Sequence, residues 1–361
     1  MLPEHSAFEQ PWPLSELLLA YLNFADDYYR DRSVPPGPDG RHPSTGELEN
    51  MKHAIRRLMP YGKQPVTKFD APALEGIQAA MVGEGLSRNY INSTLNRIRR
   101  IFRWGVRKKF VKAEQLIELQ SVDALKKGRS DAREPAPRES VADEWIEAIL
   151  PFLSRQVAAM VQLQRLTGMR SDEVCRMRAC DIDRSGDIWL YEPDRHKTSY
   201  RGKPRSIPLG PQAQEILLPF LTSLGERFLF SPQEAQAERA ALLRAARKTK
   251  VQPSQQCRRK PSPRRSPGHR YNSGTYRTAV QRAITQANRW REQQNQEQGL
   301  DLPPVPMWHP YQLRHTLSTV VRKAFGEEAA QVSLGHSKMD TTALYGERNL
   351  KLAMEVARKL G

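Results

Sequence analysis

Near the C-terminus the chain reads Leu313-Arg314-His315 and then Leu334-Gly335-His336, and a single Tyr345 follows nine residues beyond that histidine. Far upstream, Thr167-Gly168-Met169-Arg170 places a second arginine in a tight turn. Guanidinium groups can fork onto the two non-bridging oxygens of a phosphate, a phenol can attack phosphorus, and an imidazole can bond the phosphate or shuttle protons. These side chains together indicate phosphodiester cleavage without a metal ion or other cofactor.

The composition indicates a polyanionic partner. The 361 residues include 57 Lys and Arg against 40 Asp and Glu, which gives a formal net charge of +17. Each phosphate that Lys or Arg neutralises releases counterions, so binding to nucleic acid is tight and sensitive to salt. A solvated basic surface or a packaging protein would carry the same charge, so the charge alone predicts no activity. The length allows two domains, each with its own core.

The number of cysteines and the lengths of the apolar runs indicate where in the cell the protein is located. Cys175, Cys180 and Cys257 are too few and too irregularly spaced for a disulfide framework or a zinc site, which indicates a reducing compartment. No signal peptide opens the sequence, and no run approaches the 18 apolar residues of a membrane span. We therefore expect a cytoplasmic protein, associated with the nucleoid when it is bound to DNA.

The first third of the chain has helical spacing throughout. After a tail over residues 1–13, we expect a helical DNA-binding domain over residues 14–127. Apolar residues three and four positions apart predict four helices, which begin near Leu14, at a capping box over Ser44-Thr45-Gly46-Glu47, at an Asp70 N-cap and at Ser87.

The fourth predicted helix combines a buried stripe with basic and amide side chains. Arg and Asn are the residues that bond phosphates and base edges, and here they share a side of the helix. A solvated basic face is the alternative interpretation. The candidate DNA contacts are Arg88, Asn92, Asn96, Arg99 and Arg103.

A change of composition divides the chain. Residues 128–140 are rich in proline and charge without periodicity, which predicts a linker before a second domain over residues 141–361. In that domain Ser171 is expected to cap a helix directly after Arg170, and residues 188–191 and 205–209 read as two strands of a hairpin. Between Arg239 and Arg270 there is no acidic residue, and we interpret residues 235–275 or so as an inserted, partly disordered basic segment.

Taken together, these motifs make the chain resemble the tyrosine recombinase or phage integrase family. The resemblance extends from about Leu14 to Gly361 and depends on the order of its motifs, since each motif alone is weak. The matching positions are Arg170 with Glu173 one turn later, Lys197 in the hairpin, Gln312-Leu313-Arg314-His315, His336 and Tyr345. It implies a mainly α fold, with a helical core-binding (SAM-like) N-terminal domain and a mostly helical catalytic domain that holds a small antiparallel sheet.

The resemblance also implies a role for each residue. Tyr345 would be the nucleophile that forms a 3′-phosphotyrosine, and Arg170 and Arg314 would bind the non-bridging oxygens of the scissile phosphate. Lys197 would protonate the leaving 5′-oxygen, with Lys203 as the competing candidate, and His336 would assist proton transfer. In the free protein the arginines could instead pair with Glu173 or another acid.

One position departs from the family pattern. The family usually has a histidine three residues before the second arginine, where this chain has Tyr311. Tyr311 can still donate a hydrogen bond to phosphate, or it can be structural. His309 lies two residues earlier, on a different helical phase and next to Pro310.

The expected function is site-specific recombination of double-stranded DNA, without metal or ATP, by protomers that assemble as a tetramer in the synapse. An apolar stripe after Tyr345, over Ala353, Val356, Ala357 and Leu360, would dock on a neighbouring protomer or on its own domain. Relaxation of supercoils by a type IB topoisomerase would use the same residues. A catalytically inactive DNA-binding regulator is the third possibility. Loss of one arginine or of the tyrosine would indicate it, but Arg170, Arg314 and Tyr345 are all present.

Overall fold

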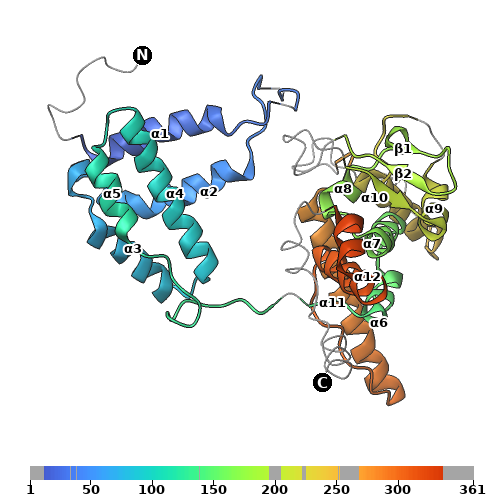
Figure 1. The fold of residues 1–361 in the computed structure, drawn as a ribbon. Helices are drawn as coiled ribbons and strands as arrows, with labels where there is room; N and C mark the ends of the chain where they lie inside the picture. Colours follow the sequence, from blue (N-terminus) through green and yellow to red (C-terminus); the bar gives the residue numbers. More distant parts are fainter. Residues whose placement is uncertain are drawn as a thin grey trace, which may run out of the picture. The chain divides into compact units, whose positions relative to one another are not determined.

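The computed structural model describes residues 12–32, 34–37, 39–137, 139–194, 205–221, 225–250, 252 and 268–335. The chain divides into two compact units, Met1–Pro137 and Arg138–Gly361 (Figure 1). No helix in the described ranges is long and apolar enough to cross a membrane.

Unit 1 is helical. Its α-helices are α1 (Leu14–Tyr28), α2 (Gly46–Leu58), α3 (Ala71–Gly83), α4 (Arg88–Arg107) and α5 (Ala113–Ser121). Short 3₁₀ turns at Met59–Tyr61 and Val66–Lys68 connect α2 to α3. The fifth helix, α5, was not among the four predicted, because its stripe holds only two buried residues, Gln115 and Leu119.

The predicted stripe of α4 forms the centre of the unit 1 core. Ile91, Leu95, Ile98 and Phe102 are fully buried, and α4 packs against α1, α2, α3 and α5. The Phe102 ring stacks on Phe69 with the ring centroids 5.3 Å apart. Apolar burial is thus concentrated on one face of α4, and the opposite face is left to its polar side chains.

The helix starts are partly as predicted. Asp70 is confirmed as the N-cap of α3, since its carboxylate accepts a hydrogen bond of 2.9 Å from the Ala73 amide. The predicted capping box before α2 is wrong, because Thr45 makes no capping bond with its side chain. The carboxylate of Glu47 instead binds Arg97 and Arg100 of α4. Long-range ion pairs therefore replaced the local cap.

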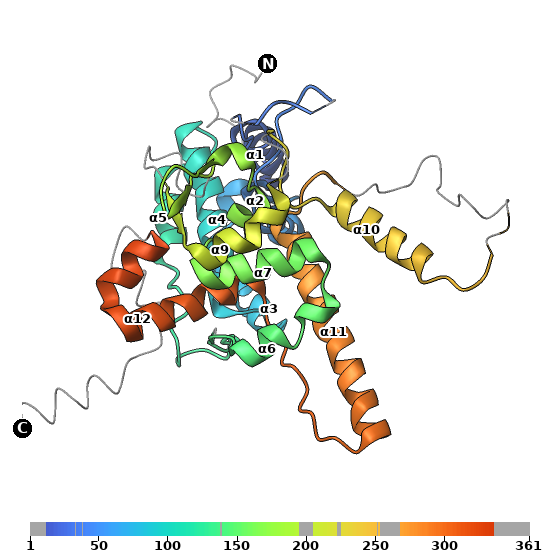
Figure 2. The same ribbon diagram turned by 90° about the vertical axis from the view of Figure 1, so that its right-hand side faces the viewer.

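Unit 2 combines two long helices, α11 and α12, with shorter elements. Its α-helices are α6 (Asp143–Glu147), α7 (Arg155–Thr167), α8 (Ser171–Cys175), α9 (Pro211–Leu217), α10 (Pro232–Ala245), α11 (Ser273–Gln298) and α12 (Pro310–Leu334). The 3₁₀ turns lie at Leu150–Phe152, Ala179–Asp181 and Leu218–Phe220. α7 packs along α12 and also contacts α9 (Figure 2).

A small antiparallel sheet covers one side of α7. Its strands β1 (Ile182–Asp183), β2 (Trp189–Tyr191) and β3 (Ile207–Leu209) pair in the order β1-β2-β3, with Tyr191 opposite Ile182 on one side and Ile207 on the other. The predicted hairpin corresponds to β2 and β3. Its connecting turn, which holds Lys197 and Lys203, lies outside the described residues.

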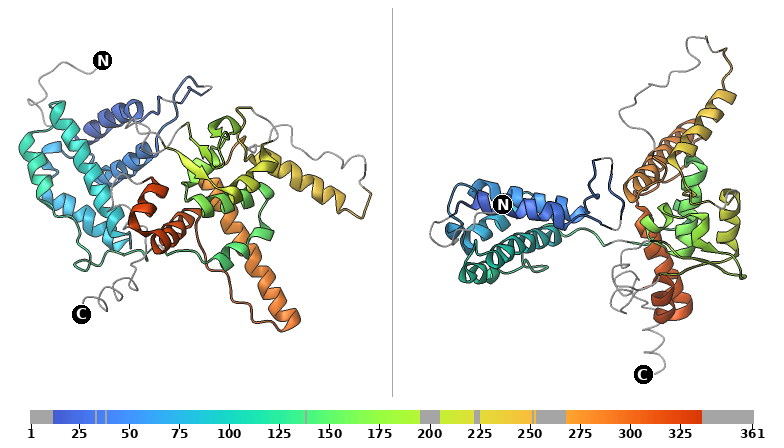
Figure 3. Two further views of the ribbon diagram at one scale, coloured as in Figure 1. Left: turned by 45° about the vertical axis from the view of Figure 1, so that its right-hand side comes forward. Right: turned by 90° about the horizontal axis from the view of Figure 1, so that it is seen from above.

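The basic segment after residue 235 begins as a helix. α10 extends to Ala245, so the start of the predicted disordered insert is ordered, and Ala235 alone among its residues is buried. α11 was not predicted and follows the undescribed residues 253–267. Both helices reach outward from the rest of unit 2 (Figures 2 and 3).

Removal of the Phe102 ring is expected to destabilise unit 1. Phe102→Ala leaves a cavity against Phe69 and should lower the free energy of unfolding by about 3 to 5 kcal/mol. Ile117→Ala, which shortens an exposed apolar side chain of α5, serves as the control. Denaturant titrations of both variants measure the effect, and equal midpoints would contradict the central position of Phe102.

Candidate active site

The turn after α7 brings Arg314 and the upstream motif together. α7 ends at Thr167, and Gly168 caps it in the left-handed conformation with φ of 61°. The Gly168 carbonyl accepts a hydrogen bond of 2.7 Å from Nη1 of Arg314, and the Leu334 carbonyl accepts one of 2.6 Å from Nη2. The fully buried Arg314 therefore joins the turn after α7 to the last residue of α12.

Arg170 is held by Glu173. The Glu173 carboxylate accepts 2.7 Å and 2.8 Å hydrogen bonds from the backbone amide and from Nη1 of Arg170. Arg170 is the N-cap residue of α8, so the predicted cap at Ser171 is one residue too late. The Arg170 side chain keeps 19% of its surface exposed, whereas that of Glu173 keeps 2%. The ion pair expected for the free protein is thus present, and it sets the direction of the guanidinium.

The charges around Glu173 shift several pKa values. Burial alone would raise the pKa of the Glu173 carboxyl, but the charges of Arg205 and Arg170 and the hydrogen bonds from Arg170 lower it below its usual value. Burial and the charge of Arg170 lower the pKa of Arg314 to about 10. Arg314 remains charged at neutral pH, so the site presents a desolvated positive charge.

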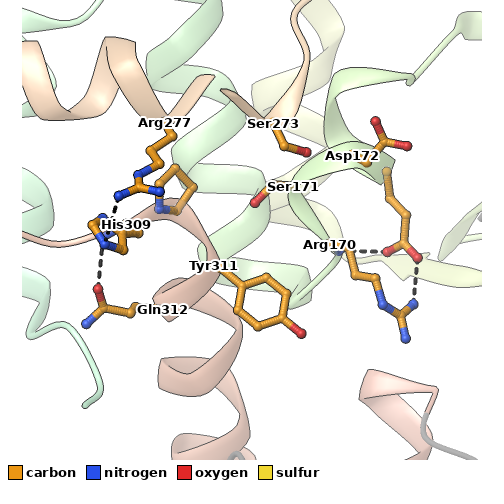
Figure 4. Close-up of a pocket in the computed structure, with 10 residues that line it drawn as sticks. Arg170, Ser171, Asp172, Ser273, Arg277, His309, Tyr311 and Gln312 are labelled. Atoms are coloured by element: carbon orange, nitrogen blue, oxygen red, sulfur yellow. Dashed lines mark hydrogen bonds and ion pairs between the residues drawn. The ribbon is translucent and has the colours of Figure 1, made fainter. Parts of the chain in front are cut away.

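A cavity of about 520 Å³ opens beside this cluster, between α8 and the first turns of α11 and α12. Arg170 and Tyr311 both line it, and the Tyr311 side chain points toward Arg170 (Figure 4). The Tyr311 ring lies edge-on to His315 with the centroids 5.8 Å apart. Tyr311, which stands where the family pattern has a histidine, therefore faces the same cavity as Arg170.

His309 and Arg277 line the same cavity. The amide of His309 donates a 2.9 Å hydrogen bond to Gln312, which places the histidine as the N-cap residue of α12. Its Nε2 lies 3.4 Å from Nη2 of Arg277 on α11. His309 precedes the first residue of α12, so helical periodicity does not place it on a different face from Tyr311. Arg277 belongs to no motif by which the sequence could have identified it.

Arg205 is a further residue that the motifs missed. It precedes β3, its side chain is 7% exposed, and its Nε lies 3.9 Å from the Glu173 carboxylate. A lone arginine next to a strand resembles any surface charge of a basic chain, so no sequence pattern distinguishes it. The predicted site residues Lys197, His336 and Tyr345 lie outside the described residues.

The DNA-contact candidates of α4 divide into two groups. Arg88 pairs with Glu134, Asn92 exchanges hydrogen bonds with the backbone of Leu125, and Arg99 donates to the carbonyls of Leu119 and Val122. These three side chains bind the α4 surface to the segment that follows it. Asn96 and Arg103 are exposed. Asn96 accepts from Arg99, whereas no intramolecular bond of the Arg103 side chain is present in the described part of unit 1.

Comparison with known proteins identifies the family of this chain. The sequence model of the phage integrase family matches residues 140–351. The Tn1549 transposon integrase, in complex with transposon right end DNA, has a TM-score of 0.59 and 15% identity, over 96% of this chain and 99% of that one. A lambda integrase tetramer bound to a Holliday junction has a TM-score of 0.61 and 15% identity, over 94% and 79%. No curated protein sequence matches.

The helical fold with its small antiparallel sheet and the family match define the class, which is that of the tyrosine-type site-specific recombinases. This chain belongs to the phage integrase family. The fold expected from the sequence is confirmed, since the structural likeness covers nearly the whole chain.

A methyl group at Gly168 is expected to disturb the site. Its Cβ would lie 2.7 Å and 2.8 Å from the side chains of Leu317 and Leu334, beside the carbonyl that binds Arg314. Gly299→Ala is the matched control, because Gly299 also caps a helix with positive φ but has open space around it. Each variant loses about 1 to 2 kcal/mol to left-handed strain.

Gly168→Ala should lose about 1 to 3 kcal/mol more through overpacking. It should also slow DNA cleavage, whereas Gly299→Ala should cleave at the wild-type rate. Thermal unfolding and a cleavage assay measure the two effects, and identical behaviour of the variants would contradict the tight packing around Gly168.

The two groups on α4 predict different outcomes of substitution. Arg103→Ala should weaken DNA binding and reduce the slope of log K against log salt by roughly one unit, as the loss of one phosphate contact does. Arg99→Ala should mainly lower the melting temperature, because its guanidinium binds two backbone carbonyls. Binding curves at several salt concentrations measure the difference. An unchanged slope for Arg103→Ala would show that this face of α4 is a solvated surface that does not bind DNA.

Proposed function

We propose that this chain cuts and rejoins double-stranded DNA at specific sites through a 3′-phosphotyrosine, with Tyr345 as the nucleophile. The observation that carries the proposal is the connection of both arginine motifs through one turn, where Arg314 binds Gly168 two residues before Arg170. The family match over residues 140–351 contains every proposed catalytic residue. We further propose that residues 14–127 are the core-binding domain and that residues 141–361 are the catalytic domain.

Arg170 and Arg314 would stabilise the charge that develops on the scissile phosphate. Arg170 binds Glu173 through Nη1, and its Nε and Nη2 make no hydrogen bond within the described residues, so they can donate to a non-bridging oxygen. Arg314 would donate to the other oxygen. Because Arg314 has no exposed surface in the free chain, we expect DNA binding to rearrange what surrounds it.

The remaining steps are proton transfers and exchange of the leaving group. The Tyr345 oxygen would attack phosphorus, the bond to the 5′-oxygen would break, and Lys197 would supply the proton to that oxygen. His336 would bond the phosphate and assist the transfer, and Tyr311 would donate a hydrogen bond from the side of the cavity opposite α8. The phosphotyrosine conserves the energy of the broken bond, so a 5′-hydroxyl of a second strand can attack it without ATP.

Strand exchange between two duplexes requires four active sites, so we propose a tetramer on DNA. The lambda integrase structure is such an assembly on a Holliday junction. A DNA substrate and the absence of a disulfide pattern in the sequence support a cytoplasmic location. A type IB topoisomerase would relax any supercoiled plasmid, whereas a recombinase acts on plasmids that carry its sites, so plasmids with and without sites distinguish the two.

Substitution of the nucleophile tests the proposal directly. Tyr345→Phe should bind DNA as the wild type does but form no covalent adduct with a nicked duplex that traps the cleaved strand. Denaturing gels detect the adduct, which should also form in EDTA because arginines and Lys197 supply the positive charge that a metal would. An adduct with Tyr345→Phe, or strict dependence on magnesium, would refute the mechanism.

A further inference from the structure

Arg205 is buried with few of the hydrogen bonds that a buried guanidinium requires. Its side chain is 7% exposed, and its Nε and Nη2 have no hydrogen-bond partner among the residues that the structure describes. The nearest counter-charge is Oε1 of Glu173, 3.9 Å from Nε, which is an ion-pair distance and too long for a hydrogen bond. Unsatisfied buried charges are costly and rare, and they concentrate where function requires them.

The same side chain fills the space beside Gly335. A Cβ at Gly335 would lie 2.1 Å from Nη1 of Arg205 and 2.9 Å from Cζ, so this position accepts no larger residue while Arg205 is in place. Gly335 ends α12 with φ of 62°, directly after the Leu334 carbonyl that binds Arg314. In the sequence it immediately precedes His336. Arg205 therefore contacts the turn that leads to a proposed catalytic residue.

Three guanidinium groups share one carboxylate in this cluster. Arg170, Arg205 and Arg314 all interact electrostatically with Glu173. The charge of Arg170 also lowers the pKa of the two buried arginines, Arg205 and Arg314. Burial lowers the pKa of Arg205, and the Glu173 charge opposes that shift. Since Glu173 neutralises only one of three positive charges, the cluster retains an excess that a phosphodiester can balance.

We propose that Arg205 is a positioning residue for the cleavage reaction, which holds Glu173 and the Gly335 turn so that Arg170 and His336 meet the same phosphate. It acts through Glu173, whose carboxylate also binds Arg170. By sharing this carboxylate, Arg205 leaves the charge of Arg170 less neutralised and more available to the phosphate. The inference rests on the proposed function, because it assigns Arg205 a part in that reaction.

The test compares two substitutions of Arg205 at saturating DNA. Arg205→Met keeps an unbranched buried side chain without the charge, and Arg205→Lys keeps the charge without the fork. Arg205→Met should bind DNA as the wild type does but form the covalent adduct about 10- to 100-fold more slowly, as misplacement of a reacting group does. Arg205→Lys should recover part of the rate. Arg155→Ala is the control, since it removes a half-exposed arginine paired with Glu238.

A double-mutant cycle separates positioning from general damage. If Arg205 acts through Glu173, then Arg205→Met should slow cleavage much less in a Glu173→Gln background than in the wild type. Equal losses in both backgrounds would overturn the proposal. Should Arg205→Met fail to fold, as judged by circular dichroism, the same cycle with Arg205→Lys decides, because it also removes the fork while leaving a buried cation.

The pH profile is a readout that loss of packing alone would not move. The groups that face Glu173 are Arg170, Arg205, Arg314 and Tyr191, and burial keeps the Tyr191 phenol neutral because it raises its pKa well above 10. Removal of the Arg205 charge should raise the pKa of Glu173, so protonation would weaken its hold on Arg170 as the pH falls. The cleavage rate of Arg205→Met should therefore decrease from about pH 7 to about pH 5 relative to wild type, while that of Arg205→Lys should follow wild type.

The outcomes distinguish the inference from the proposed function. If wild type forms no adduct, the proposed function fails whatever Arg205 does. If wild type forms the adduct and Arg205→Met matches it in rate and pH dependence, the role of Arg205 is refuted and the proposed function stands.

Discussion

The Glu173 carboxylate is the constraint around which the buried arginines of unit 2 are arranged. It receives the backbone and the side chain of Arg170, it lies within ion-pair distance of Arg205, and its charge also acts on Arg314. These three arginines come from the start of α8, the segment before β3 and the first turns of α12. A single acid thus relates α12 to segments that precede it by more than a hundred residues in the sequence.

The geometry of this cluster depends on two glycines with positive φ. Gly168 and Gly335 end α7 and α12, and each turn lets a carbonyl at the helix end face the Arg314 guanidinium. Side chains crowd both glycines, so neither position has room for a Cβ. Left-handed helix ends usually favour glycine for conformational reasons alone. Here the crowding adds a second reason, because Leu317 and Leu334 at Gly168, and Arg205 at Gly335, occupy the space that a larger residue would need.

Arginine serves both folding and binding in this chain, and sequence alone does not separate the two uses. Basic and amide residues recur along α4, and five of them, Arg88, Asn92, Asn96, Arg99 and Arg103, were candidate DNA contacts. Arg88, Arg97, Arg99 and Arg100 turn out to bind acids or carbonyls within unit 1. Their partners come from α2, from α5 and from the segment after α5, and such long-range pairs leave no local pattern. The exposed Arg103 is distinguished only by the structure.

The structural features that were predicted correctly from the sequence are those determined by residues close together in the chain. The buried stripe of α4, the Asp70 cap, the β2–β3 hairpin and the glycine turn before Arg170 all follow from spacing within a few residues. α11 escaped prediction because its sequence is mostly polar, with buried residues confined to its first half. Arg205, Arg277 and His309 escaped a functional assignment because their importance arises from neighbours distant in the chain. The capping box failed for the same reason, since the Glu47 carboxylate binds the side chains of Arg97, Arg100 and Asn50 and does not cap the start of its helix.

The departure at Tyr311 has a physical interpretation in this setting. A histidine at that position could carry a proton and a positive charge, whereas a phenol offers a neutral hydrogen bond. The cavity that Tyr311 lines already holds the cationic side chains of Arg170 and Arg277, with His309 beside Arg277. Another cation there would add repulsion with Arg170 and Arg277. A neutral donor would make the proposed hydrogen bond to phosphate without that repulsion, so the substitution is consistent with a site whose positive charge comes from its arginines.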